Sequence, residues 1–320
     1  MLYGSANRPF VTRVFTPWLT RLIDSIIPNQ LHSIIAAWIR ESPIVTEVIH
    51  TYGVSLDYGV EALISILLIY LSLLGFFYFY MKITQKLLQT TTKILVFFVF
   101  VAFLGLVPLF KVGYIYDLPQ LFLSTLAIYL IASNKVLPYF LVFFCAVLNK
   151  ETSIILIFPS FLLFWNPVKT KVKNVVIGLF SQLAIFSLVR LPLLVKYRDN
   201  PGENLSFHFF DHLKVIRHYP FATILTLSIA ALFILLMIHD WKKKPAIISL
   251  GLCSALVLLI LFFIGGFPFE FRVFYEVYTI LVISVTMSFL ALRGILIRIK
   301  AQDTEQLIES FDIFWRYLHR

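Results

Sequence analysis

A lysine and a glutamate stand side by side between two strongly apolar runs. The stretch NKET, residues 149–152, separates two segments that contain no other charged residue. Adjacent opposite charges of this kind can line an outward cavity and hold a polar substrate, since ionisable groups are costly in apolar surroundings unless they are used. A structural interpretation also fits: Asn149 caps the next helix, Glu151 complements its positive end, and Lys150 pairs with Glu151.

Charged residues recur where two further apolar segments begin. Glu270 and Arg272 flank Phe271, and Glu276 lies about one turn into the segment that follows. Asp117 opens a third segment, DLPQLFLSTLAIYLI. A Glu–Arg pair and a capping aspartate explain these residues structurally. Three helices that begin with charged groups nevertheless favour a shared polar site.

The composition indicates the environment of these segments. Of the 320 residues, 60% are hydrophobic and only 14% are charged, and the mean hydropathy is +0.89. Apolar runs of nearly 20 residues recur, which would leave most of the surface of a soluble domain apolar. The fold class we predict is therefore all-α, a polytopic transmembrane helical bundle. Cys145 and Cys253 lie inside apolar runs and indicate neither a disulfide framework nor a metal site.

About nine spans are predicted, each preceded or followed by a short polar connection. Three of them, between residues 118 and 165, are short for a bilayer about 30 Å thick. The predicted spans are 58–80, 93–110, 118–133, 136–149, 152–165, 174–190, 220–239, 246–264 and 273–292.

The distribution of lysine predicts the orientation. The positive-inside rule assigns the lysine-rich set of short loops to the cytoplasm, which also makes the C-terminus cytoplasmic. That set contains Lys82, Lys86, Lys93, Lys135, Lys169, Lys171, Lys173, Lys242, Lys243, Lys244, Arg293, Arg298 and Lys300. The alternate set, with residues 111–117, 149–152 and 265–272, then lies outside together with the first 57 residues. Most arginines fall on this outer face, and arginine suits bidentate binding of phosphate or carboxylate.

Three regions follow from this pattern. Residues 1–57 form an outer segment with amphipathic helices, in which Val14, Trp18 and Leu22 share one face typical of an interfacial helix. Residues 58–300 form the transmembrane domain, with a long outer loop at 191–219. Residues 301–320 form a cytoplasmic amphipathic helix that either lies at the interface or docks a protein partner.

These elements resemble the GT-C class of multi-spanning glycosyltransferases, which use polyprenyl-phosphate-linked sugars. The stretch NKETS (149–153) looks like the Lys-Glu-Thr element that opens a middle helix in many members. EFRVF (270–274) is similar, with one insertion-like difference, to a late Glu-x-Arg-Phe element. The segment NRPF…R…PWLTRL (7–22) is similar to an Arg-Pro-Leu-Leu-Pro element of these enzymes and of related uncharacterised bacterial membrane proteins. The outer amphipathic helices also match the class.

The resemblance implies inverting sugar transfer on the extracytoplasmic face of a membrane, most simply the bacterial inner membrane. A carboxylate deprotonates the acceptor hydroxyl while polyprenyl phosphate leaves, and cations stabilise the departing phosphate. It implies Glu151 or Asp117 as the base. The residues expected to bind substrate or phosphate are Arg8, Arg13, Lys150, Arg272, Glu270, Arg198 and His212. No metal ligands are assigned and a divalent cation stays an open option; the partners are membrane lipid and a lipid-linked sugar, with no nucleic acid.

One departure from the class matters. GT-C enzymes usually carry an acidic residue just after the first span, but no acidic pair precedes Arg8, and Asp57 is a poor substitute by context. We expect either that an insertion machine carries the long N-terminal tail across the membrane or that a further helix lies upstream. The alternative function is a transporter or flippase for a lipid-linked substrate, or a scaffold subunit without chemistry. No internal repeat is visible, which favours an interfacial enzyme over a transporter.

Overall fold

The structure, a computed structural model, describes residues 4, 6–51, 54–89, 91–107, 114–165, 172–202, 207–266, 270–295 and 298–299. It is all-helical except for one pair of two-residue antiparallel strands, β1 (Leu88–Gln89) and β2 (Arg298–Ile299). The predicted helix at 301–320 lies outside the described residues.

The α-helices are α1 (Phe15–Ile26), α2 (Asn29–Glu41), α3 (Pro43–Thr51), α4 (Gly59–Leu87), α5 (Thr92–Leu106), α6 (Asp117–Ala132), α7 (Val136–Asn149), α8 (Ile157–Phe164), α9 (Val172–Lys196), α10 (Phe209–His218), α11 (Pro220–Ile238), α12 (Ala246–Gly265) and α13 (Tyr278–Leu292). Short 3₁₀ helices are η1 (Phe10–Thr12), η2 (Leu56–Tyr58), η4 (Glu151–Leu156), η5 (Trp241–Lys243) and η6 (Phe271–Glu276).

Each predicted span coincides with a helix of the described residues. In the described part of the chain, three helices are long and apolar enough to cross a membrane: Leu56–Leu87, Lys173–Lys196 and Ala246–Gly265. These helices indicate a membrane protein. Other apolar helices are shorter, such as α6 with 16 residues and α7 with 14, where a complete crossing needs about 20. The count of nine spans stays a prediction.

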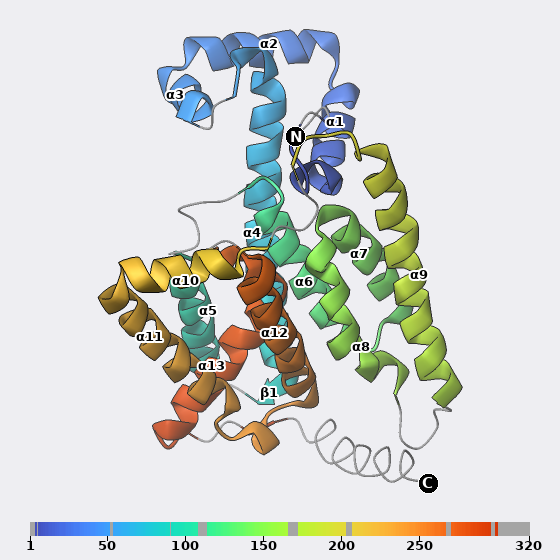
Figure 1. Cartoon of the computed structure of the whole chain (residues 1–320). Coiled ribbons are helices and arrows are strands. Elements are labelled where there is room, and N and C mark those ends of the chain that lie inside the picture. The colour runs from blue at the N-terminus through green and yellow to red at the C-terminus, as the bar shows by residue number, and fades with distance from the viewer. Residues whose placement is uncertain are drawn as a thin grey trace.

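The N-terminal helices form an arm at one end of the bundle. α2 crosses the N-terminal end of the long helix α4, and α1 leads from α2 back to the bundle (Figure 1). Gly59 permits this crossing, because a Cβ there would lie 3.2 Å from Ile39 of α2. The amphipathic helices predicted before residue 57 are confirmed as helices, and α3 is an additional one.

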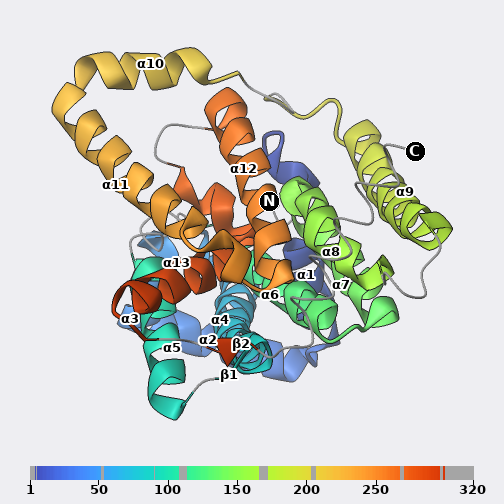
Figure 2. The same cartoon turned by 90° about the horizontal axis from the view of Figure 1, so that it is seen from below.

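The core of the bundle surrounds α6, which buries residues on most of its circumference, including Leu121, Ser124, Thr125 and Ile128. α6 packs closely against α4, where a Cβ on Gly75 would lie 2.6 Å from the ring of Phe122. Seen along the bundle, α10 and α11 lie at one side of the periphery and α9 at the other (Figure 2).

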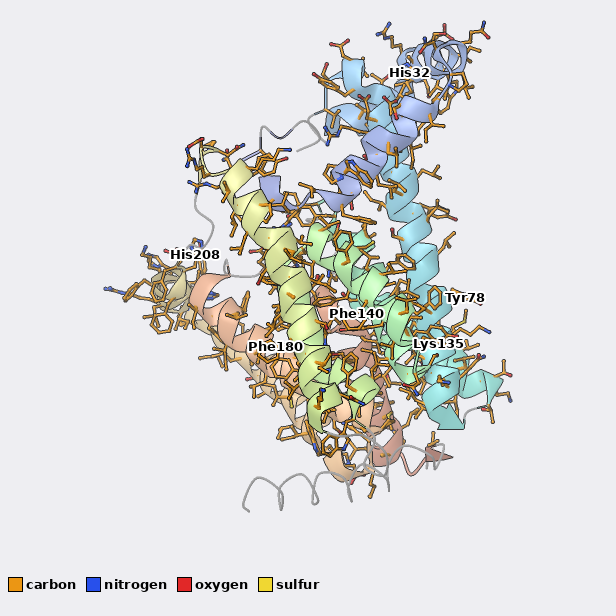
Figure 3. All side chains as sticks on the ribbon, turned by 90° about the vertical axis from the view of Figure 1, so that its right-hand side faces the viewer. His32, Tyr78, Lys135, Phe140, Phe180 and His208 are labelled. Carbon is orange, nitrogen blue, oxygen red and sulfur yellow. The ribbon has the colours of Figure 1, made fainter. Side chains whose placement is uncertain are left out.

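The two ends of the bundle differ in their connections. His32 and His208 lie toward the end that carries the arm and α10, and Lys135 lies toward the opposite end (Figure 3). α6 begins and α7 ends at the arm end, so Asp117 and the NKET stretch lie at the same level. The predicted outer loop 191–219 is largely helical, because α9 continues to Lys196 and α10 covers Phe209–His218.

Candidate functional site: a charged cluster at one end of the bundle

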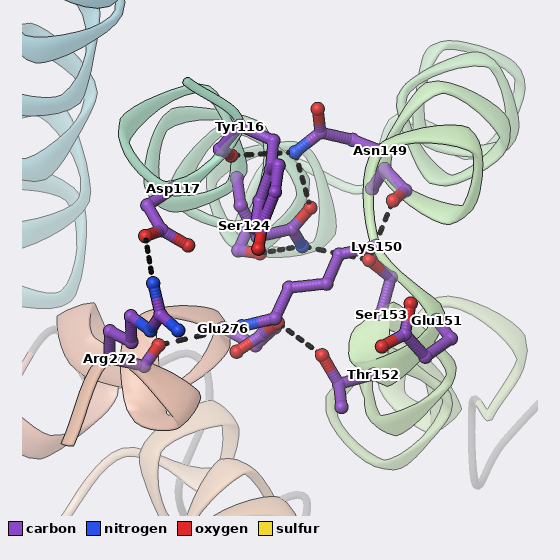
Figure 4. Close-up of polar contacts among 12 residues, drawn as sticks. Tyr116, Asp117, Ser124, Asn149, Lys150, Glu151, Thr152, Ser153, Arg272 and Glu276 are labelled. Atoms are coloured by element: carbon purple, nitrogen blue, oxygen red, sulfur yellow. Dashed lines mark hydrogen bonds and ion pairs between the residues drawn. The ribbon is translucent and has the colours of Figure 1, made fainter. Parts of the chain in front are cut away.

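Eight charged side chains from separate segments gather at the arm end of the bundle. We call them the charged cluster: Arg13, Asp117, Lys150, Glu151, Arg190, Glu270, Arg272 and Glu276. Four are cations and four are carboxylates. Ion pairs join them in three groups, Glu151 with two arginines, Lys150 with Glu276, and Arg272 with two carboxylates, and several appear in close-up in Figure 4.

The break between α7 and η4 separates the two charges of the NKET stretch. α7 ends at Asn149, and Lys150 is extended, with φ −156° and ψ 137°. Consecutive side chains on an extended backbone point in opposite directions. Lys150 therefore reaches Glu276, with 3.1 Å between Nζ and Oε1, whereas Glu151 reaches Arg13 on the other side. Lys150 and Glu151 are therefore paired with different residues and not with each other.

Glu151 is held by two guanidinium groups. Arg13 donates from Nη2 to Oε1 at 2.6 Å and from Nε to Oε2 at 3.3 Å. Arg190, near the end of α9, donates from Nη2 to Oε2 at 3.0 Å and from Nη1 to the carbonyl oxygen of Thr12 at 2.9 Å. The side chains of Arg13 and Arg190 are 9% and 5% exposed, against 34% for Glu151. The carboxylate therefore covers the two arginines from the solvent side.

Electrostatics keeps Arg13 charged. Burial alone would lower the pKa of Arg13, but the Glu151 carboxylate beside it outweighs this effect and holds the pKa above its usual range. Arg13 also donates to the hydroxyl of Tyr116 and stacks over its ring, with 4.6 Å between the guanidinium carbon and the ring centroid.

Arg272 makes a similar contact with a second tyrosine, Tyr114, whose ring stacks on that of Tyr116. Its guanidinium carbon lies 3.9 Å from the ring centroid of Tyr114, and the Tyr114 and Tyr116 rings stack with centroids 5.3 Å apart. Arg272 donates to Glu270 at 2.7 Å and to Asp117 Oδ2 at 3.4 Å. Each of the two tyrosine rings thus contacts one guanidinium group and the other ring, a favourable arrangement of cations on aromatic faces.

The remaining ion pair, between Lys150 and Glu276, lies beside Arg272. Besides its bond to Glu276, the Lys150 ammonium lies 3.5 Å from the carbonyl oxygen of Arg272. Thr152 donates from its hydroxyl to Glu276, which is fully buried. A charge at that depth is stable only with such partners.

Neutral polar side chains fix the backbone behind the charged cluster. Asn149 donates to the carbonyl oxygen of Tyr116 at 2.8 Å and to Gln120 Oε1 at 3.0 Å, and it accepts from the Thr16 hydroxyl at 2.8 Å. Gln120 in turn donates to Ser153 at 2.7 Å. This network joins α1, α6, α7 and η4, and of the eight charges Asp117 lies on α6 and Glu151 on η4.

Six of the predicted site residues are brought together here: Arg13, Asp117, Lys150, Glu151, Glu270 and Arg272. Three others lie elsewhere. Arg8 donates to the carbonyl oxygen of Asn200 at 2.8 Å, and Arg198 pairs with Asp199 while 74% exposed. His212 contacts the carbonyl oxygen of Gly266 at 3.0 Å and packs against Phe262.

Arg190, Tyr116, Asn149 and Gln120 were not among the predicted site residues. A signal for Arg190 does exist in the sequence, because an arginine at the end of an apolar helix needs a buried partner. Tyr116, Asn149 and Gln120 carry no such signal, since capping and ordinary core packing explain them equally well.

Two buried carboxylate oxygens, Asp117 Oδ1 and Glu276 Oε2, and the Nε of Arg190 have no hydrogen-bond partner in the described part of the chain. Within that part, no group of three or more His, Cys, Asp or Glu side chains is arranged to hold a metal ion.

No family model, curated protein or solved structure matches this chain.

Proposed function

We propose that this chain is an integral membrane glycosyltransferase that transfers a sugar from a polyprenyl-phosphate donor on the extracytoplasmic face. The charged cluster is its site. The observation that carries the proposal is the convergence of Asp117, Glu151 and Arg272, from three distant segments, at one end of the bundle. Maintaining eight ionisable groups beside apolar helices is costly, which favours a function for them.

Asp117 is the better supported of the two candidate bases. Both oxygens of Glu151 accept bonds from guanidinium groups, which stabilise its charge and weaken it as a proton acceptor. Asp117 retains one oxygen, Oδ1, with no hydrogen-bond partner among the described residues. In the proposed reaction this oxygen takes the proton of the acceptor hydroxyl. The hydroxyl oxygen bonds to the sugar C1 carbon, and the bond from C1 to the phosphate oxygen breaks.

The cations stabilise the charge that develops on the departing phosphate. Arg272 lies beside Asp117, and Arg13 and Lys150 complete the positive side of the site. Arg198 and His212 lie outside the charged cluster, in the segment proposed to shape the acceptor site, and Arg8, which also lies outside the cluster, was expected at the phosphate. A divalent cation remains an option for donor binding.

The lysine-rich connections support the proposed orientation of the bundle in the membrane. The positive-inside rule assigns their end of the bundle to the cytoplasm and the charged cluster to the outer face. The compartment we propose is the bacterial inner membrane, with the C-terminus cytoplasmic and the helix at 301–320 available to a protein partner.

A scaffold without chemistry is the second candidate. It is favoured by the pairing of each of the four cations with a carboxylate of the same chain.

The test is donor turnover by the purified chain in nanodiscs. A radiolabelled sugar is supplied on polyprenyl phosphate or on a nucleotide, together with cell-envelope material of the source organism as acceptor. We expect the labelled sugar to be transferred from the polyprenyl-phosphate donor and not from the nucleotide donor. Absence of transfer from either donor would contradict the proposal and favour the scaffold.

A further inference from the structure

The two arginines that hold Glu151 leave one of their hydrogen-bond donors unused. The Nε and Nη2 atoms of an arginine lie on one edge of the guanidinium and form a fork for oxyanions. Arg13 gives both atoms of this edge to Glu151. Arg190 gives only Nη2, and its Nε is buried without a hydrogen-bond partner among the described residues.

A buried N–H without an acceptor is unfavourable, so a further acceptor oxygen beside Arg190 would stabilise the site. The two forks present four donors. A phosphate group with three terminal oxygens can accept from all four, whereas the two oxygens of Glu151 accept from three. With Glu151 in place the three side chains carry one net positive charge, and without it they carry two, which matches a phosphate dianion.

Both arginines are fixed from behind, independently of Glu151. Arg13 is held by the Tyr116 hydroxyl and ring, and Arg190 by the carbonyl oxygen of Thr12. Glu151 is the most exposed member of this group and follows an extended residue, Lys150, at the break after α7. Its side chain can therefore turn toward solvent while the arginines keep their positions.

We propose that Arg13 and Arg190 form a phosphate-binding site in which Glu151 serves as an internal substitute for the ligand, displaced when a phosphate binds. This inference rests on the proposed function, because it names the two residues that hold the polyprenyl phosphate released on sugar transfer, a monoester with three terminal oxygens, and adds Arg190 to the site. The same chemistry would also accept a free phosphate, so the test must separate the two sources.

The test measures binding and does not require sugar transfer. The full chain, purified in detergent, is titrated with inorganic phosphate, farnesyl phosphate and farnesol. We expect Glu151→Gln to tighten the binding of both phosphates about tenfold, because a competing anion is removed. We expect Arg190→Lys to weaken it at least about tenfold, because lysine lacks the fork. Arg40→Lys, on the exposed face of α2, is the matched control and leaves the affinity unchanged.

Each outcome decides the question. Stronger binding of farnesyl phosphate than of inorganic phosphate, with none of farnesol, assigns the site to a lipid phosphate; equal binding of both phosphates assigns it to free phosphate. Unchanged or weaker phosphate binding by Glu151→Gln overturns the inference. If that variant does not fold, an unchanged affinity in Arg190→Lys overturns it instead. Phosphate binding as expected, together with an absence of sugar transfer, would contradict the proposed transferase function but support the phosphate-binding site.

Discussion

At the scale of single residues, Asn149 is the neutral side chain on which the charged cluster most depends. It is fully buried and bonds to three partners on α1, on α6 and just before α6. Its amide fixes the level at which α7 ends, and with it the directions in which Lys150 and Glu151 leave the backbone.

We therefore predict that Asn149→Ala lowers the free energy of unfolding by about 1–3 kcal/mol, because it leaves buried polar groups unpaired. Thermal unfolding of the purified protein in detergent is the measurement. Asn174→Ala, the same change on the exposed surface of α9, is the control and should have little effect. Equal stability of the two variants would contradict a structural role for Asn149.

The ion pair of Lys150 and Glu276 permits a sharper test. Removing one partner leaves an uncompensated buried charge, so Glu276→Gln alone should cost about 3–5 kcal/mol. The double variant Lys150→Met with Glu276→Gln should be more stable than Glu276→Gln alone, because no charge remains unpaired. Denaturant unfolding of the single and double variants measures this coupling. Strictly additive losses would show that the two groups do not interact.

Much of the charged cluster could be predicted from the sequence, but its pairing could not. Asp117, Lys150, Glu151 and Arg272 stand out because each lies at the start of an apolar segment. The neighbouring charges Lys150 and Glu151 suggest a mutual pair, yet the backbone break sends them to different partners. Such a direction depends on local dihedral angles and on packing between distant helices, which periodicity does not reveal.

At the scale of elements, the apolar segments were predictable because each is long, uniform and bounded by polar residues. The helix types at two boundaries were not. The segments at 152–165 and 273–292 begin as the 3₁₀ helices η4 and η6, where charged and hydroxyl side chains bond to partners on other helices. Tertiary contacts decide that geometry, so propensity alone does not predict it.

The close crossing of α12 and α13 yields a prediction at this scale. A Cβ on Gly251 would lie 2.0 Å from Cδ1 of Ile280. Gly251→Ala should therefore destabilise the protein by about 1–3 kcal/mol through overpacking. Adding Ile280→Val removes the clashing methyl group and should restore part of the loss. Thermal unfolding of both single variants and the double variant checks this. If the double variant recovers no stability, the close contact between Gly251 and Ile280 would be contradicted.

At the scale of the whole molecule, the proposed function requires one orientation of the bundle in the membrane. The arm of α1–α3 and the charged cluster share one end of the bundle, and Lys135 lies toward the other (Figure 3). Only if the arm end faces outward can the site meet an extracytoplasmic donor.

Cysteine labelling tests this orientation in intact cells. In a background without Cys145 and Cys253, cysteines replace Gln30 of the arm and Lys135 at the opposite end, both exposed. A membrane-impermeant maleimide should label position 30 in intact cells and position 135 only after permeabilisation. The reverse pattern would place the charged cluster in the cytoplasm.

The most direct test of the central claim is turnover of a polyprenyl-phosphate-linked sugar by Asp117→Asn, beside the matched control Asp57→Asn at an exposed aspartate on η2. Loss of a general base predicts that Asp117→Asn lowers the transfer rate about 10²–10⁴-fold while the protein stays folded. Asp57→Asn should transfer sugar at the rate of the unsubstituted protein. A folded Asp117→Asn protein with an undiminished rate would contradict the claim.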